Sequence, residues 1–319
     1  MWPAAVAGCS LLTDLSGFSE VVASGDAGGD SATDALTKEA AADAPPPSDA
    51  GRCDPTKPFG APVALAALNL PAENDRAAQL TPDELTIYFS SDRSNERRIY
   101  RATRARVEDP FGPPALLDEL TTPSYDFLTA APSADGLELI VEVRGLDGGT
   151  GRSDLRRLTR ASTAVLFGSS TDISSVNTGE DETDPHLGAA GLELWFARRV
   201  AGKFDIFVSS RSTLAAAFGS PSPLAGVINA PSASETDPVP SADRTELFFQ
   251  TDRDGTARVW VAHRSSVTEP FGTPVHVTEL DGPGTNDVPN WLSPDRCVLY
   301  LTSYRENAIA DLYVATRPH

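Results

Sequence analysis

The chain has 319 residues, with 26 basic against 45 acidic side chains and a net charge of −19. Nucleic-acid binders and proteins that dock on anionic lipid rely on clustered lysines and arginines, so this balance argues against both classes. No apolar run approaches the roughly 20 residues needed to cross a bilayer, and the many prolines and glycines are typical of short strands joined by turns.

The N-terminus carries a short motif around a cysteine. Residues 6–9, Val-Ala-Gly-Cys, resemble a bacterial lipobox, which implies a lipid anchor on Cys9 and an envelope location facing the periplasm or the cell exterior. No Lys or Arg precedes the motif, and the apolar stretch is shorter than a working signal needs; a start site assigned too late would explain both departures. We therefore expect residues 1–9 to be the remnant of a lipoprotein signal. The alternative is an ordinary cysteine in a disordered tail.

The next segment, residues 10–52, consists mostly of Ala, Gly, Ser, Asp and Pro. Such a composition cannot bury enough apolar surface to offset chain entropy, and it suits a spacer between an anchor and a folded domain. We expect disorder here and assign residues 53–319 to the fold.

From residue 74 onward one pattern recurs five times. Two apolar strands flank a turn, as in 78–81 and 85–90, and a third strand follows, as in 99–103. The turn positions Asp83, Asp135, Ala190, Asp243 and Asp295 are separated by 52, 55, 53 and 52 residues. A fixed period of this length indicates a repeat architecture.

A second motif, Phe-Gly followed by a short apolar strand, lies between these units. It begins at Phe59, Phe111, Phe167, Phe218 and Phe271. Each period then holds four strands in about 50 residues, which is what one antiparallel propeller blade requires. The sequence predicts an all-β fold, a five-bladed β-propeller.

Three of the repeats, LTPDELTIYFSSDR, PSADRTELFFQTDR and LSPDRCVLYLTSYR, resemble the TolB-like β-propeller repeat, and the resemblance covers residues 74–317. It departs at Ala190, which replaces the turn Asp, and at residues 143–145, which replace Ser-x-Arg. Members of that family are typically envelope proteins that bind other proteins. The resemblance thus implies a monomeric scaffold whose partner is another envelope protein or a peptide, although a fold alone does not transfer a function.

One acid stands ahead of each predicted inner strand: Asp75, Asp126, Asp184, Asp237 and Asp287. In a propeller these residues would ring one mouth of the central channel and hold a calcium ion or a basic peptide. Alternatively, each Asp caps the turn before its strand by accepting hydrogen bonds from backbone amides. Arginines that follow each turn, namely Arg93, Arg144, Arg199, Arg253 and Arg305, are expected to form ion pairs or carbonyl bonds within a blade.

Three further candidates are aromatic or imidazole side chains at positions where the repeats differ: Tyr125, His186 and Trp291. They either contact a ligand at the channel or pack against a neighbouring blade. The four histidines show no metal spacing, and no Gly-x-Ser-x-Gly nucleophile motif is present. The favoured interpretation is a binding scaffold without catalysis. The alternative is a glycosidase-type propeller, in which Asp126, Asp184 and Asp237 supply the two carboxyl groups that glycoside hydrolysis needs.

The order of strands also predicts how the ring closes. The repeats begin with a Phe-Gly strand and end with a third strand, so residues 63–68 must complete the last blade and remove an open edge. This closure brings Cys53 near Cys297, and if Cys9 is lipidated these are the two remaining thiols in an oxidising compartment. We therefore expect a Cys53–Cys297 disulfide; the alternative is a buried Cys297 and an unpaired Cys53.

Overall fold

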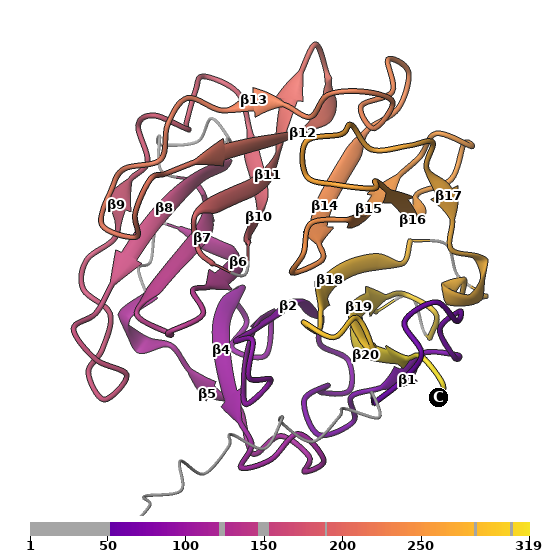
Figure 1. Cartoon of the computed structure of the whole chain (residues 1–319). Helices are drawn as coiled ribbons and strands as arrows, with labels where there is room; N and C mark the ends of the chain where they lie inside the picture. Colours follow the sequence, from indigo (N-terminus) through magenta and orange to yellow (C-terminus); the bar gives the residue numbers. More distant parts are fainter. Residues whose placement is uncertain (1–51, 121–124, 146–152, 189, 284–285, 307–308) are drawn as a thin grey trace, which may run out of the picture. The chain divides into compact units, whose positions relative to one another are not determined.

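The computed structural model describes residues 52–120, 125–145, 153–188, 190–283, 286–306 and 309–319. The lipobox around Cys9 and the expected spacer lie outside the described residues, apart from Arg52. Within the described residues the fold is a five-bladed β-propeller of four-stranded antiparallel sheets, as the sequence predicts (Figure 1).

Blades 1 to 4 follow the chain, and each runs from an inner first strand to an outer fourth strand. Blade 1 contains β2 (Asp75–Leu80), β3 (Thr86–Ser91), β4 (Arg98–Thr103) and β5 (Ala115–Leu116). Blade 2 contains β6 (Asp126–Pro132), β7 (Glu138–Arg144), β8 (Ser153–Thr159) and β9 (Thr171–Asp172). Blade 3 contains β10 (Glu182–Leu187), β11 (Glu193–Val200), β12 (Lys203–Ser210) and β13 (Ser222–Pro223). Blade 4 contains β14 (Glu235–Pro240), β15 (Glu246–Thr251), β16 (Arg258–His263) and β17 (Val275–His276).

Blade 5 joins the two ends of the folded chain. It contains β18 (Val288–Leu292), β19 (Val298–Ser303), β20 (Asp311–Thr316) and, as its outer strand, β1 (Val63–Ala64). Val63 pairs with Val314 in an antiparallel register, and a disulfide joins Cys53 to Cys297 across 244 residues of sequence. The N-terminal strand therefore closes the ring, as predicted, and a covalent link reinforces it.

The Phe-Gly motif has a structural explanation at the outer end of each blade. In every blade an arginine at the end of the third strand lies over the phenylalanine ring; the pairs are Arg104–Phe111, Arg160–Phe167, Arg211–Phe218, Arg264–Phe271 and Arg317–Phe59. Such cation–π contacts stabilise the ring and the guanidinium together, and they are stronger where the guanidinium is buried, as that of Arg211 is. The glycine allows close backbone approach, since a Cβ at Gly60 would lie 3.3 Å from the carbonyl oxygen of Thr316. The Phe-Gly pair is therefore an element of blade architecture.

Every first strand contains a β-bulge where it pairs with the second strand. The extra residue takes a left-handed backbone conformation in three blades, with φ of 55° at Ala77, 53° at Asp184 and 52° at Asp237. Bulges redirect side chains and backbone amides locally. Here the redirected amide reaches the preceding blade: Ala77 N donates to Thr302 Oγ1 at 3.0 Å.

The only helical segments in the described part of the chain are two single 3-10 turns, Asp118–Leu120 and Thr278–Leu280. None of the described helices is long and apolar enough to span a membrane. The first strands contact one another around the ring, in the order β2, β6, β10, β14, β18 and back to β2, so they surround the propeller axis.

Candidate functional site

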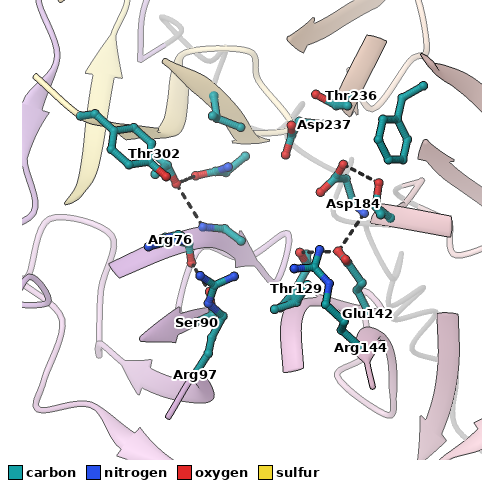
Figure 2. Close-up of a pocket in the computed structure, with 17 residues that line it drawn as sticks. Arg76, Ser90, Arg97, Thr129, Glu142, Arg144, Asp184, Thr236, Asp237 and Thr302 are labelled. Atoms are coloured by element: carbon teal, nitrogen blue, oxygen red, sulfur yellow. Dashed lines mark hydrogen bonds between the residues drawn. The ribbon is translucent and has the colours of Figure 1, made fainter. Parts of the chain in front are cut away.

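The bulged ends of the first strands surround a cavity of about 300 Å³, and all five blades contribute to its lining (Figure 2). Bulge residues and their neighbours on the second strands form most of the wall. In blades 1, 3 and 4 the bulge turns an amide toward the preceding blade, and the side chains of Ala77, Asp184 and Asp237 line the axial space. This cavity is the candidate functional site.

Three carboxyl groups from consecutive blades line one side of the cavity: Glu142 on β7, Asp184 on β10 and Asp237 on β14. Burial, together with the charge of Asp184, raises the pKa of Glu142 to about 8. Burial also raises the pKa of Asp184, and burial together with the charge of Asp184 raises that of Asp237 well above its usual range. Carboxyl groups that lose water and repel one another retain protons at neutral pH.

Hydrogen bonds fix this carboxyl cluster in place. The amide of Asp184 donates to Glu142 Oε2 at 3.1 Å, and Thr183 Oγ1 donates to Asp184 Oδ2 at 2.8 Å. The backbone amide of Asp237 in turn lowers the pKa of Asp184 by hydrogen bonding. Glu142 and Asp184 are thus each connected to the next blade through a bulge amide, so their positions depend on the strained backbone of the first strands.

Two arginines from blade 1, Arg76 and Arg97, line the cavity away from the carboxyl cluster (Figure 2). Both approach Asp92, with Arg97 Nε at 3.4 Å and Arg76 Nη2 at 3.7 Å from its carboxylate oxygens. The Nε atom of Arg76 is buried and has no hydrogen-bond partner among the described residues. Burial and the charge of Arg97 lower the pKa of Arg76. A third arginine, Arg144, lies beside Glu142 and lowers the pKa of that carboxyl group.

The predicted ring of acids is split between two structural positions. Asp184 and Asp237 line the cavity, whereas Asp75 and Asp287 are buried where the first strands begin. Asp75 accepts hydrogen bonds from Leu70 N at 2.8 Å and Arg93 Nη2 at 2.6 Å, so it has the capping geometry. Asp287 makes the corresponding contacts with Gly282 N and Arg305, and Glu182 and Glu235 occupy the same position in blades 3 and 4. Asp126 is exposed at the start of β6 and does not line the cavity.

The arginines predicted to form contacts within a blade do so, except that in blade 3 the residue at the equivalent position is Arg198 rather than the predicted Arg199. Arg93, Arg253 and Arg305 each bind a loop carbonyl oxygen and a buried acid of their own blade. In blade 3 this role belongs to Arg198, and Arg199 pairs with Asp181. Arg144 instead donates to Ser153 Oγ and reaches the cavity.

His186 and Trp291 lie at the opposite ends of their first strands, around a second cavity of about 40 Å³. Both side chains are buried. His186 Nδ1 has no hydrogen-bond partner in the described part of the chain, and burial lowers the pKa of this histidine to about 4. Tyr125 lies elsewhere, half-buried against the apolar cluster between blades 1 and 2.

Glu142, Arg76 and Arg97 belong to the site, but the sequence analysis did not identify them. Glu142 interrupts the apolar run of β7, and a lone acid in a buried strand is a usable signal of a functional position. Among the described residues, no group of three or more His, Cys, Asp or Glu side chains has the arrangement to hold a metal ion.

No family model matches this sequence, and no curated protein matches it. Solved structures that resemble the fold include a protein assigned as TolB from Agrobacterium tumefaciens, with 16% identity and a TM-score of 0.49 over 76% of this chain and 73% of the other. TolB from Acinetobacter baumannii has 14% identity and a TM-score of 0.48 over 77% of this chain, which spans 55% of that protein. A thermostable family-43 glycoside hydrolase has 11% identity and a TM-score of 0.49 over 77% of this chain and 89% of the other. The structural neighbours of this chain thus include TolB β-propeller proteins and a glycoside hydrolase, and at these identities the likeness concerns the fold alone.

Proposed function

We propose that this protein is a binding module of the bacterial envelope and that the carboxyl-lined cavity at its axis takes a small polar ligand. The observation that carries the proposal is the cavity of about 300 Å³, into which five blades direct charged and hydroxyl-bearing side chains that strand pairing does not require. Ligand sites are concave, and they combine a packed scaffold with a few convergent polar groups whose pKa values are perturbed. The proposed binding needs no catalytic step.

The envelope location is part of the same proposal. Lipidation at Cys9 would attach the propeller to a membrane through the spacer of residues 10–52. The disulfide between Cys53 and Cys297 supports an oxidising compartment, in which such bonds persist. Mass spectrometry of protein purified from a bacterial envelope tests the anchor: a diacylglyceryl adduct on Cys9 is expected, and an unmodified Cys9 in membrane-free protein would overturn it. An envelope protein or peptide remains the proposed partner of the propeller as a scaffold.

The binding proposal is tested by thermal shift with the full chain against a panel of amino acids, sugars, polyols and polyamines. The Asp184→Asn/Asp237→Asn double variant replaces two cavity carboxyl groups by amides, and Asp126→Asn is the matched control because Asp126 is an exposed Asp outside the cavity. We expect a stabilising compound to act on the wild type and on the control but not on the double variant. A compound that stabilises all three proteins equally binds elsewhere, and a panel without any stabilising compound contradicts the proposal.

Glycoside hydrolysis is the second candidate, favoured by one specific observation. Such enzymes need a protonated carboxyl group near an ionised one, and Glu142 has a pKa raised to about 8 beside two further carboxyl groups. Asp126 lies outside the cavity, so Glu142 would replace it in the predicted set. Assays with aryl glycosides separate the two functions. Turnover that disappears in Glu142→Gln while folding is retained would establish hydrolysis, and absent turnover across the substrates favours binding alone.

A further inference from the structure

The axial cavity separates its charges into two groups. Arg76 and Arg97 from blade 1 lie on one side, and Glu142, Asp184 and Asp237 from blades 2 to 4 lie on the other (Figure 2). In a site built only for architecture, these opposite charges would pair directly with one another. No ion pair joins the two groups among the described residues, so the arginines and the carboxyl groups each face the space between them.

On the arginine side, two guanidinium groups share a single carboxylate. Asp92 is the common partner of Arg76 and Arg97, which leaves one positive charge in excess. Arg76 lines the cavity, and its buried Nε has no hydrogen-bond partner among the described residues, so the guanidinium keeps an unused donor. A guanidinium with an unused donor is suited to bind a carboxylate, which accepts charge-assisted hydrogen bonds from planar nitrogen donors.

On the carboxyl side, three acids face one nearby arginine. Arg144 lowers the pKa of Glu142 and Asp184, but burial outweighs it at both groups, together with the charge of Asp184 at Glu142, and keeps the pKa of both above the ordinary value. An ammonium group placed among these acids would favour their ionised forms and accommodate its three donors on carboxylate oxygens.

Neutral side chains also line the cavity. Thr129, Asn290 and Thr302 contribute hydroxyl and amide groups, and Tyr304 and Phe204 contribute aromatic rings. A volume of about 300 Å³ lies at the lower end of the range for small-molecule sites, roughly 300–1,000 Å³. The ligand is therefore a compound of a few atoms between its charged ends rather than an oligomer.

We propose that the cavity binds a small zwitterion, a free α-amino acid or a close analogue, with its carboxylate on Arg76 and its ammonium group among Asp184, Asp237 and Glu142. This inference rests on the proposed function of the cavity as a ligand site. It names the ligand class whose charged ends match the arginines and the carboxyl groups at once, whereas a sugar carries no charged group for either side.

Binding of such a ligand is coupled to proton release. An ammonium group favours the ionised form of each neighbouring carboxyl group, and it therefore lowers the pKa of groups that are partly protonated at pH 7. Affinity is expected to rise as the pH rises from 6 to 8, with protons released to the buffer. A neutral ligand in the same cavity would show little of this dependence.

The test is calorimetric titration of the full chain with the twenty standard amino acids at pH 7.5, in two buffers of different ionisation enthalpy. We expect at least one amino acid to bind with a heat that differs between the buffers. Its amide, which lacks the carboxylate, and its N-acetyl derivative, which lacks the ammonium group, should each bind about tenfold more weakly or worse.

Two variants assign the charged ends. Arg76→Gln should weaken binding of the parent amino acid but not that of its amide, and Asp184→Asn should weaken the parent but not the N-acetyl derivative. A structural role for either residue would instead weaken every ligand equally. Arg106→Gln is the control, because Arg106 is an exposed arginine paired with Asp109 outside the cavity.

The outcomes separate this inference from the proposed function. If no amino acid binds but a sugar or polyol binds in the cavity, the zwitterion inference is overturned and the ligand site stands. If amino acids bind but the Arg76→Gln and Asp184→Asn variants leave the affinity for the parent amino acid unchanged, the zwitterion inference is also overturned. If nothing in either panel binds, both proposals are wrong.

Discussion

Reduction of the Cys53–Cys297 disulfide is expected to destabilise the propeller strongly, because the bond holds together the only blade that is built from both ends of the folded chain. The two cysteines are 244 residues apart, and a cross-link over a loop of this length removes about 5 kcal/mol of unfolded-state entropy in the chain-entropy model. For a domain of this size, each kcal/mol corresponds to roughly 2–4 °C in Tm. Reduction should therefore lower Tm by roughly 10 °C or more.

The assay is thermal unfolding of the full chain with and without a reductant that does not absorb in the far ultraviolet. Cys53→Ser serves as the matched variant: it should melt like the reduced wild type and should not respond to reductant. Thiol titration of the denatured, unreduced protein gives an independent reading, in which Cys53 and Cys297 should be absent from the free-thiol count. Equal Tm values in the two conditions, with the bond shown to be reduced, would refute the entropic account of closure.

Three further perturbations follow from buried polar groups. Asp75→Ala should destabilise the fold by about 3–5 kcal/mol in denaturant titration, because it leaves Arg93 without its buried partner; a loss below 1 kcal/mol would show that the pair is dispensable. Arg211→Met should cost less, about 1–3 kcal/mol, because Glu138 loses its two hydrogen bonds to Arg211 but keeps its ion pair with Arg157, and Glu138→Gln on that background should restore part of the loss. His186 should make the protein acid-sensitive: its pKa falls from about 6.5 in the unfolded chain to about 4 in the fold, so stability is lost as pH falls through this window, by about 3 kcal/mol in total. The difference between wild type and His186→Gln across pH 7 to 4 isolates this contribution, and a constant difference contradicts it.

The sequence predicts the architecture well because each blade repeats the same local solution. The turn after the first strand shows this clearly, since Ser133, Ser241 and Ser293 each donate to the aspartate two residues later, and Thr81 does the same. The signals are short-range: alternating apolar residues, turn residues at fixed spacing and the Phe-Gly pair. Patterns of this kind can be recognised in a single sequence. Ring closure follows from counting strands rather than from any single motif.

The cavity is less predictable because it depends on registers that a one-residue bulge changes. Counting eight residues back from the turn position reaches Asp75 in blade 1 but Glu182 and Glu235 in blades 3 and 4, so Asp184 and Asp237 fall two residues later. The acids predicted to form one ring therefore come from both positions: Asp75 and Asp287 occupy the earlier one, and Asp184 and Asp237 the later one. A bulge adds one residue to a strand without leaving a strong sequence mark, and a shift of a single residue exchanges the two faces of a strand. The proximity of Glu142 to Asp184 and Asp237 in the next two blades could not be predicted from the sequence for the same reason.

The bulges also explain why the candidate site and the strained backbone coincide. A non-glycine residue in the left-handed region costs roughly 1 kcal/mol, and aspartate tolerates this conformation better than most residues. Asp184 and Asp237 adopt it, and the same geometry directs the amide of Asp184 onto Glu142. In blade 1 the bulge residue is Ala77, which has the same conformation and the same kind of amide contact but no carboxyl group. The left-handed backbone is therefore shared by blades 1, 3 and 4, while the carboxyl groups are present only in blades 3 and 4. Tolerance of this backbone favours aspartate over alanine, but it does not require two buried carboxyl groups beside a third, and binding at the axis supplies an explanation.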